Sequence, residues 1–222
     1  MLTLLLHPRA LLAAITWFGD SGFLLPVSLW ITAWLGLPPA TRGSAGRWVV
    51  LFGLGCSMIL ASKLAFLGWG IGIAEIDFTG FSGHTALSAS IWPVAGWLVT
   101  SQQGHRVRVT AAVLGLVFAA AIGASRLVLH AHSPSEVAAG FVLGAAVSGL
   151  FLWWQHRSPH PRLSWMLVVL SLATPALLQR PGSAAPTQDA LEVIAMRLAG
   201  TDRVYTRADL LARRNGSPIG SE

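Results

Sequence analysis

The chain has 222 residues, of which 54% are hydrophobic and only 11% are charged, and its formal net charge is +6. A soluble domain carries roughly 25% charged residues, so this composition excludes an ordinary soluble protein and indicates one lipid-embedded domain. The arginines lie mainly in short connectors, which favours a role in membrane topology over nucleic-acid binding. The single Cys56 excludes an intrachain disulfide and a metal cluster of thiolates.

Residues 1–20 predict a segment that lies on the membrane surface rather than a signal peptide. Their apolar run is interrupted by His7, Pro8 and Arg9, and no positively charged region precedes it. Trp17 and Phe18 suit the depth of the lipid headgroups. We therefore expect an interfacial helix here.

Six later stretches approach the roughly 20 apolar residues that a membrane-spanning helix needs. They are Ser21–Leu37, Trp48–Trp69, Thr85–Thr100, Val107–Leu127, Glu136–Trp154 and Leu163–Leu178. Small residues recur at four-residue spacing in the fifth, "G-F-V-L-G-A-A-V-S", which is typical of closely packed membrane helices. The sequence thus predicts an all-α polytopic membrane bundle of about six transmembrane helices over residues 21–178.

The connectors between these stretches alternate in character. One set is basic and holds Arg42, Arg47, Arg106, Arg108, Arg157 and Arg162. Its charge marks the cytoplasmic side. The other connectors must therefore face the extracytoplasmic side together, and they hold Glu75, Asp77, Ser82, His84, Arg126, His130, His132 and Glu136. We expect an integral protein of a bacterial inner membrane whose candidate chemistry lies at that outer face.

Residues 179–222 predict a linker followed by a short amphipathic helical tail. Pro, Gly and Ser dominate the linker. In "D-A-L-E-V-I-A-M-R-L-A" the apolar residues follow helical spacing, and Asp189 is placed to cap that helix. A second helix is expected to begin at Thr206. The tail is too small for a core of its own, so we expect a surface appendage.

The first polar connector offers features of an anion site. Lys63 lies near the end of the second stretch, where it either serves a site or extends to the membrane interface. Ser82, Gly83 and His84 directly precede the third stretch. A helix amino terminus favours an anion, and glycine allows its close approach. The alternative is a simple helix cap by Ser82 or Thr85.

The second polar connector carries Ser125, Arg126, His130, His132 and Glu136. His132 and Glu136 are four residues apart, so they share a helix face. The carboxylate can then hold one imidazole nitrogen and leave the other as nucleophile or base. Arg126 offers a planar fork that suits phosphate oxygens.

A zinc site is the alternative interpretation of these side chains. Its ligands would be His84, His130, His132 and Glu136. The positive charges of Lys63 and Arg126 would repel a cation there, and they favour an anion. For His130 we expect contact with headgroups at the membrane interface.

The order of these groups resembles a known family. A lysine near a helix end, then "S-G-H", then "S-R-x-x-x-x-x-H-x-x-x-acid" is similar to the three-part signature of the type-2 phosphatidic acid phosphatases, membrane relatives of the vanadium haloperoxidases. The resemblance extends from about Trp17 to about Trp154. This chain departs from the usual pattern at three places. Gly70-Ile71 stands for Arg-Pro, Phe81 for Pro, and Glu136 for Asp.

The resemblance implies a lipid phosphate phosphatase that acts on a phosphomonoester or a pyrophosphate without cofactor or metal. His132 would attack phosphorus and form a phosphohistidine, with Glu136 fixing its tautomer. His84 would protonate the leaving group and then activate water. Phosphate oxygens would be held by Lys63, Ser82, Gly83, Ser125 and Arg126.

Three further expectations complete this hypothesis. Glu75 and Asp77 are expected to pair with Lys63 or Arg126, or to lie in solvent. The partners are a lipid phosphate and membrane lipids, with no nucleic acid. The alternatives are a lipid phosphotransferase, or a non-catalytic lipid-binding or transport protein on the same scaffold.

Overall fold

The computed structural model describes residues 8–178 and 187–214, so residues 1–7, the expected linker at 179–186 and residues 215–222 lie outside the described ranges. Within those ranges the named elements are helical, and one isolated antiparallel bridge joins Ile73 to Phe78. The elements are α2 (Pro8–Trp17), α3 (Ser21–Gly36), η1 (Pro39–Thr41), α4 (Arg42–Trp69), η2 (Ala74–Ile76), α5 (Gly83–Val99), α6 (His105–Val128), α7 (Pro134–Gln155), α8 (Trp165–Leu178), α9 (Thr187–Ala199) and α10 (Arg207–Arg214).

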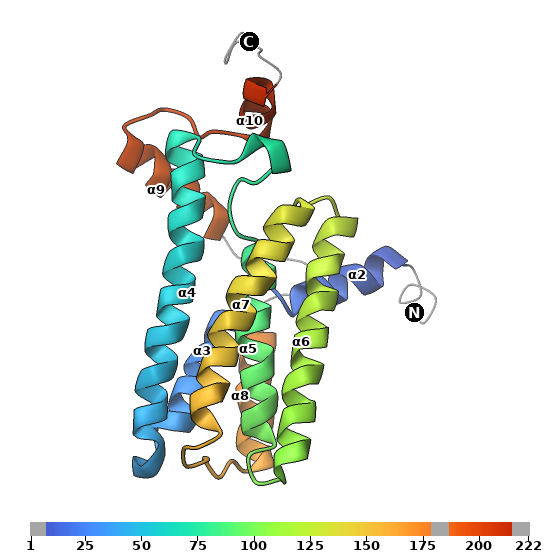
Figure 1. Ribbon diagram of the computed structural model, residues 1–222, viewed down its shortest axis with the longest axis vertical. Coiled ribbons are helices and arrows are strands. Elements are labelled where there is room, and N and C mark those ends of the chain that lie inside the picture. Colours follow the sequence, from blue (N-terminus) through green and yellow to red (C-terminus); the bar gives the residue numbers. More distant parts are fainter. Residues whose placement is uncertain (1–7, 179–186, 215–222) are drawn as a thin grey trace.

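Helices α3 to α8 run roughly along one axis, while α2 lies across the bundle beside α6 and the tail helices sit at one end (Figure 1). Three segments have the length and composition of membrane spans, namely Pro39–Trp69, His105–Val128 and Pro134–Gln155. Helices α3 and α8 are apolar but shorter. The all-helical class and the membrane character are thus confirmed, while the number of six spans stays a prediction.

Two helix starts differ from the expectation. Helix α4 begins at Arg42, so Arg42 and Arg47 lie in its first turns rather than in a connector, because no proline interrupts the chain between Pro39 and Trp69. Helix α6 begins at His105 and likewise includes Arg106. These turns still lie at the same end of the bundle as the α7–α8 connector, as predicted (Figure 1).

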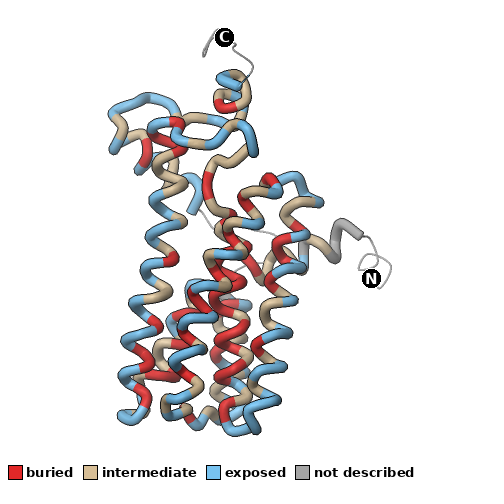
Figure 2. The backbone as a smooth tube through the Cα atoms, in the orientation of Figure 1, coloured by how far each residue is buried: buried red, intermediate tan, exposed pale blue. Residues whose placement is uncertain are grey.

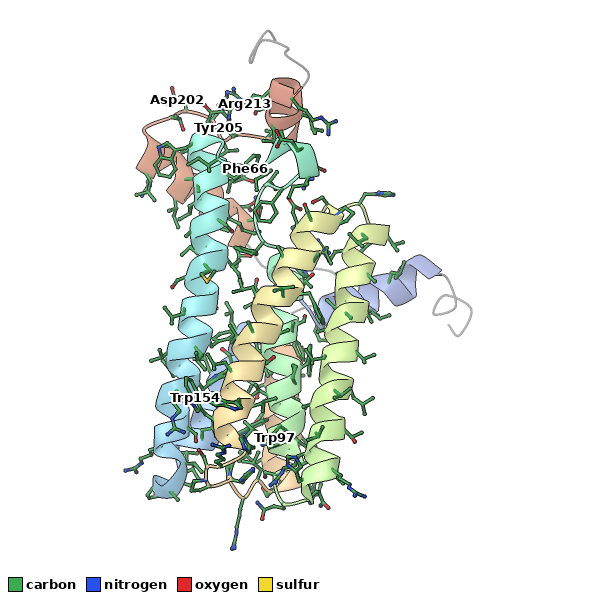
Figure 3. All side chains as sticks on the ribbon, viewed as in Figure 1. Phe66, Trp97, Trp154, Asp202, Tyr205 and Arg213 are labelled. Carbon is green, nitrogen blue, oxygen red and sulfur yellow. The ribbon has the colours of Figure 1, made fainter. Side chains whose placement is uncertain are left out.

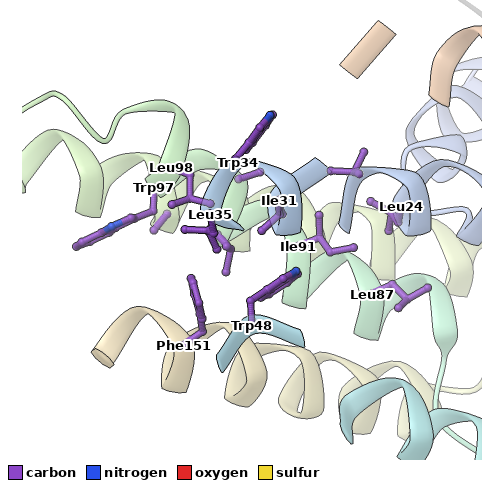
Figure 4. Packing of buried hydrophobic residues seen from close by; sticks show 14 of the residues in the cluster. Leu24, Ile31, Trp34, Leu35, Trp48, Leu87, Ile91, Trp97, Leu98 and Phe151 are labelled. Atoms are coloured by element: carbon purple, nitrogen blue, oxygen red, sulfur yellow. The ribbon is translucent and has the colours of Figure 1, made fainter. Parts of the chain in front are cut away.

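Helix α5 forms the centre of the bundle. Twelve of its side chains are buried, and it packs against α3, α6 and α7. Ile91 and Leu98 of α5 meet Trp34, Trp48 and Phe151 in one cluster (Figure 4). The outward faces of the long helices remain apolar, whereas buried residues concentrate inside (Figure 2). An apolar exterior of this extent suits contact with lipid.

Glycines bring α7 against α5, as the small-residue pattern predicted. A Cβ on Gly140 would lie 2.8 Å from the Ser82 carbonyl oxygen, and one on Gly144 would lie 2.2 Å from that of Ala86. At the end of the same contact the Ser82 N–H donates to the Glu136 carbonyl at 3.1 Å. The starts of α5 and α7 are therefore fixed side by side.

The amino-terminal segment packs more deeply than expected. Trp17 and Phe18 contact Phe23, and Phe18 also contacts Trp92 of α5. These aromatic rings join the edge of the core rather than facing only headgroups. Their hydrophobic area is large enough to make that burial favourable.

The tail is not a detached appendage, because α9 packs against α4. Ala195 and Leu210 are buried with Phe66 and Leu67, and Figure 3 shows Tyr205 and Arg213 beside Phe66 at this end. Helix α9 begins at Thr187, so Asp189 lies in its first turn rather than at its cap. The second helix does follow Thr206. An apolar stripe too small to form a core has been buried against the bundle instead.

Candidate active site

The two polar connectors and the start of α9 surround one cavity of about 750 Å³. Its polar and charged lining includes Asp20, Lys63, Thr79, His84, Arg126, His132 and Arg207. Its apolar lining includes Leu25, Ile59, Leu60, Leu87, Leu191 and Ile194. Five of the predicted site residues line this cavity together: Lys63, Gly83, His84, Arg126 and His132.

The predicted pairing of His132 with Glu136 is confirmed. His132 Nδ1 lies 2.8 Å from Glu136 Oε2. Local sequence fixes this geometry, because Ser133 caps α7 and forms a reciprocal capping box with Glu136, and Pro134 suits the first turn. Since Nδ1 is engaged by the carboxylate, Nε2 is the ring nitrogen left for chemistry.

Glu136 is a buried carboxylate with a full set of partners. Its side chain is 0% exposed. Besides His132 it accepts from the Thr79 N–H at 3.0 Å, from the Thr79 hydroxyl, and from the Ser133 N–H at 3.1 Å. Arg207 Nη2 donates to both carboxylate oxygens, at 2.8 and 2.9 Å. A buried carboxylate with this many donors is held ionised and in one orientation.

His84 stands on the first turn of α5, and Asp20 faces it. Asp20 Oδ2 lies 3.6 Å from His84 Nε2, while Oδ1 accepts from the Gly22 N–H at 2.8 Å and so caps α3. Sequence reasoning missed Asp20, which it assigned only to an interfacial segment. The available signal was an acid directly before a predicted span, on the face expected to hold the site.

The cavity is electropositive. Lys63 and Arg126 line it, and so does Gly83 at the amino terminus of α5. A helix amino terminus adds unpaired N–H groups and the positive end of the dipole. Opposite them, Asp20 is the acidic residue among the lining side chains of the described ranges. This balance suits an anion such as a phosphate group.

Two predicted phosphate ligands do not line the cavity. Ser82 is buried, and its hydroxyl bonds the Thr85 hydroxyl at 3.0 Å without capping the helix. The Ser125 hydroxyl bonds the Ile122 carbonyl at 2.6 Å and the Thr16 hydroxyl, which joins α2 to α6. Contact of either serine with phosphate stays a prediction.

The remaining ionisable residues of the polar connectors lie outside the cavity lining. His130 is exposed, has a positive φ of 52° and is not part of the cavity lining. Glu75 is exposed, as one alternative predicted. Asp77 pairs with Arg207 rather than with Lys63 or Arg126, so that part of the expectation was wrong. In the described part of the chain, no three His, Cys, Asp or Glu side chains are grouped to hold a metal ion.

Arg207 is the second residue that sequence reasoning missed. It comes from α10 and reaches both Asp77 and Glu136. Burial disfavours its charge, but the two carboxylates outweigh this and raise the pKa of Arg207 above its ordinary value. No sequence signal distinguishes it from the other tail arginines, because both of its partners lie far away in the chain.

Comparison with known proteins identifies a family for this chain. A sequence model of the PAP2 superfamily matches residues 69–159. An uncharacterized 22.5 kDa protein in the cps region of Klebsiella pneumoniae is 47% identical over 199 residues, which cover 88% of this chain and 95% of that protein. The chain belongs to the PAP2 superfamily. No solved structure matches the chain.

PAP2 membership gives a phosphatase-type activity at the level of the superfamily. The matched range contains His84, Arg126, His132 and Glu136, and it begins after Lys63. Arg207 lies outside it. The PAP2 cavity of this chain is therefore built from the matched region together with the segments before and after it.

Proposed function

We propose that this chain hydrolyses a phosphate ester or pyrophosphate of a lipid through a phosphohistidine formed at His132. The observation that carries the proposal is the environment of this histidine. Its Nδ1 is held by a buried carboxylate, and its ring lines a cavity that also contains Lys63, Arg126 and His84. A nucleophile oriented by an acid, beside a second histidine and fixed cations, is suited to phosphoryl transfer.

In the first step, His132 Nε2 forms a bond to phosphorus as the bond to the leaving oxygen breaks. His84 gives its proton to that oxygen. Glu136 stabilises the positive charge that develops on His132. In the second step, His84 takes a proton from water, the water oxygen attacks phosphorus, and the phosphorus–nitrogen bond breaks to release phosphate.

The charge that moves onto the phosphoryl oxygens during both steps is stabilised by Lys63, Arg126 and the Gly83 N–H. These donors are fixed by α4, α6 and the start of α5, so they do not have to reorganise during the reaction. Asp20, beside His84, stabilises the protonated form of that histidine in the first step.

A lipid substrate is supported by the other wall of the cavity. Leu25, Ile59 and Leu60 adjoin the charged end and provide an apolar surface for a hydrocarbon chain. The site lies at the end of the bundle opposite the basic connectors, which supports action at the extracytoplasmic face of a cell membrane.

The test is phosphate release by the purified chain from phosphatidic acid, phosphatidylglycerophosphate and polyprenyl pyrophosphates. Release is expected to persist in EDTA and to be inhibited by orthovanadate. Folded protein that releases phosphate from none of these would refute hydrolysis. Transfer to an added alcohol acceptor, in preference to water, would identify a phosphotransferase instead.

A matched pair of variants tests the nucleophile. His132→Asn is expected to lower turnover by more than about a thousandfold. His130→Asn alters an exposed histidine two residues away and is expected to leave turnover unchanged. Undiminished turnover in His132→Asn would exclude His132 as the nucleophile.

A further inference from the structure

The carboxyl-terminal tail supplies a side chain to the most buried part of the site. Arg207, at the first position of α10, lies 71 residues from Glu136 and 130 from Asp77 in the chain. Its Nη2 donates to Glu136 Oε1 at 2.8 Å and to Oε2 at 2.9 Å. Its Nη1 pairs with Asp77 Oδ2 at 2.5 Å and contacts the Asp77 carbonyl at 3.3 Å. One guanidinium thus joins two connectors.

The same carboxylate oxygens orient His132. Oε2 accepts from the Ser133 N–H and from Arg207 Nη2, and it contacts His132 Nδ1. Oε1 accepts from the Thr79 N–H and from Arg207 Nη2. With both oxygens contacted by Arg207 Nη2, the carboxyl group is held in one orientation. Removal of the fork leaves Glu136 buried with fewer donors, and its hold on His132 weakens.

Nη1 of Arg207 contacts Asp77 and Nη2 contacts both carboxylate oxygens of Glu136, so both terminal nitrogens are engaged by acids. This separates Arg207 from Lys63 and Arg126, which line the same cavity. Its contacts thus point to an action through these acids.

Several contacts hold the tail in the position that this requires. The Tyr205 N–H donates to the Leu67 carbonyl at 2.9 Å, and Arg213 Nη1 donates to the Gly70 carbonyl at 3.0 Å while its guanidinium lies over the Tyr205 ring. Gly70 has a φ of +65°, and a Cβ there would lie 2.8 Å from Tyr205 Cδ1. The end of α4 is thus shaped to receive the tail.

The start of α10 is fixed as strongly. Thr206 and Asp209 cap it reciprocally, because the Thr206 N–H donates to the Asp209 carboxylate at 2.8 Å and the Asp209 N–H to the Thr206 hydroxyl at 3.3 Å. Arg207 is the next residue after this cap, so its backbone position is well determined.

We propose that Arg207 is a positioning residue of the active site, which acts through Glu136 on His132, and that the tail is thereby a part of the catalytic unit. This inference rests on the proposed function. It predicts that loss of Arg207 slows the chemical step more than it weakens substrate binding or folding.

The experiment compares Arg207→Ala with two controls in the full-length chain. Arg213→Ala weakens tail docking without touching the site, and Arg214→Ala alters an exposed arginine on the same helix. For Arg207→Ala we expect a kcat about a hundredfold below wild type, with KM within about threefold. Millimolar guanidinium is expected to restore part of that kcat, and it should have no such effect on either control. Arg207→Lys, which keeps the charge but not the fork, should lie between Ala and wild type.

Two results would overturn the inference. One is a kcat for Arg207→Ala within twofold of wild type. The other is a loss that guanidinium does not reverse and that Arg213→Ala reproduces, because the tail would then act only as a structural support.

A second measurement separates this inference from the proposed function. If wild type releases no phosphate, the proposed function fails, and orthovanadate binding is then measured by tryptophan fluorescence. A bond from His132 Nε2 to vanadium needs the same ring orientation, so binding at least tenfold weaker in Arg207→Ala supports the positioning role. Equal binding in both proteins, or none in wild type, overturns it.

Discussion

Gly144→Ala tests the contact that places the two halves of the site together. A Cβ at this position would lie 2.2 Å from the Ala86 carbonyl oxygen, 2.7 Å from the Ala89 Cβ and 3.0 Å from the Ser90 nitrogen. All three atoms belong to backbone or to a side chain that cannot rotate away. The methyl group can therefore be accommodated only if α5 and α7 separate by about 1 Å, since nonbonded carbon contacts lie near 3.5 Å.

Overpacking of this kind costs about 1–3 kcal/mol, and the upper end applies because the obstructing atoms are backbone. For a chain of this size, each kcal/mol lowers the melting temperature by about 2–4 °C, so we expect a loss of about 6–12 °C. Turnover should fall as well. Gly140, one turn nearer the site, packs against the Ser82 carbonyl, and Glu136 is bonded to the Ser82 N–H.

The assay is thermal unfolding in detergent, followed by the fluorescence of the ten tryptophans. Gly149→Ala is the matched control, because it lies on the same helix with nothing within 4 Å of the added methyl group. Its better helix propensity should leave the melting temperature equal or slightly higher. If Gly144→Ala melts within about 2 °C of Gly149→Ala, no more than the shift expected from about 1 kcal/mol, the close packing of α5 on α7 is refuted.

Two further predictions concern side chains at opposite ends of the bundle. Asp20→Asn keeps an oxygen to cap α3 but removes the charge beside His84, so kcat should fall by roughly tenfold to a hundredfold with little change in melting temperature; an unchanged kcat would exclude a role for Asp20. Burial and the nearby charge of Arg108 lower the pKa of His160. The imidazole therefore stays neutral in the folded chain at a pH where the same imidazole is already protonated in the unfolded chain. The free energy of unfolding should therefore fall as pH drops below about 6.5. His160→Gln should reduce that fall between about pH 7.5 and 5.5. An identical pH dependence of stability in both proteins would contradict this role of His160.

Much of the bundle follows from local pattern. Apolar runs predicted the helices, because burial or lipid contact of such runs leaves few alternatives. The pairing of His132 with Glu136 followed from four-residue spacing, and the meeting of the two polar connectors followed from the alternation of the basic ones. Each of these inferences depends on neighbours in sequence, or on the rule that successive connectors of a membrane protein lie on alternating sides of the membrane.

Asp20 and Arg207 could not be found in this way. Each meets its partner only through tertiary packing. Arg207 carries no local pattern that separates it from a surface charge, and the position of Asp20 before a predicted span does not identify His84 as its partner. The tail was misjudged for the same reason, since its short apolar stripe could equally face solvent or lipid, and only the surface of α4 around Phe66 decides the matter. Ser82 and Ser125 show the converse, because a motif predicts their presence but not the direction of their hydroxyls.

Arg207 follows the other site residues in the chain, and this also sets the order in which the site is completed. Helices α3 to α8 can be synthesised and inserted while Glu136 still lacks its guanidinium partner, which reaches it only after α9 and α10 have docked on α4. A chain that stops before residue 207 would carry His84, Arg126 and His132 but leave the buried acid without its strongest donor. Full assembly of the site thus reports that translation has passed residue 207.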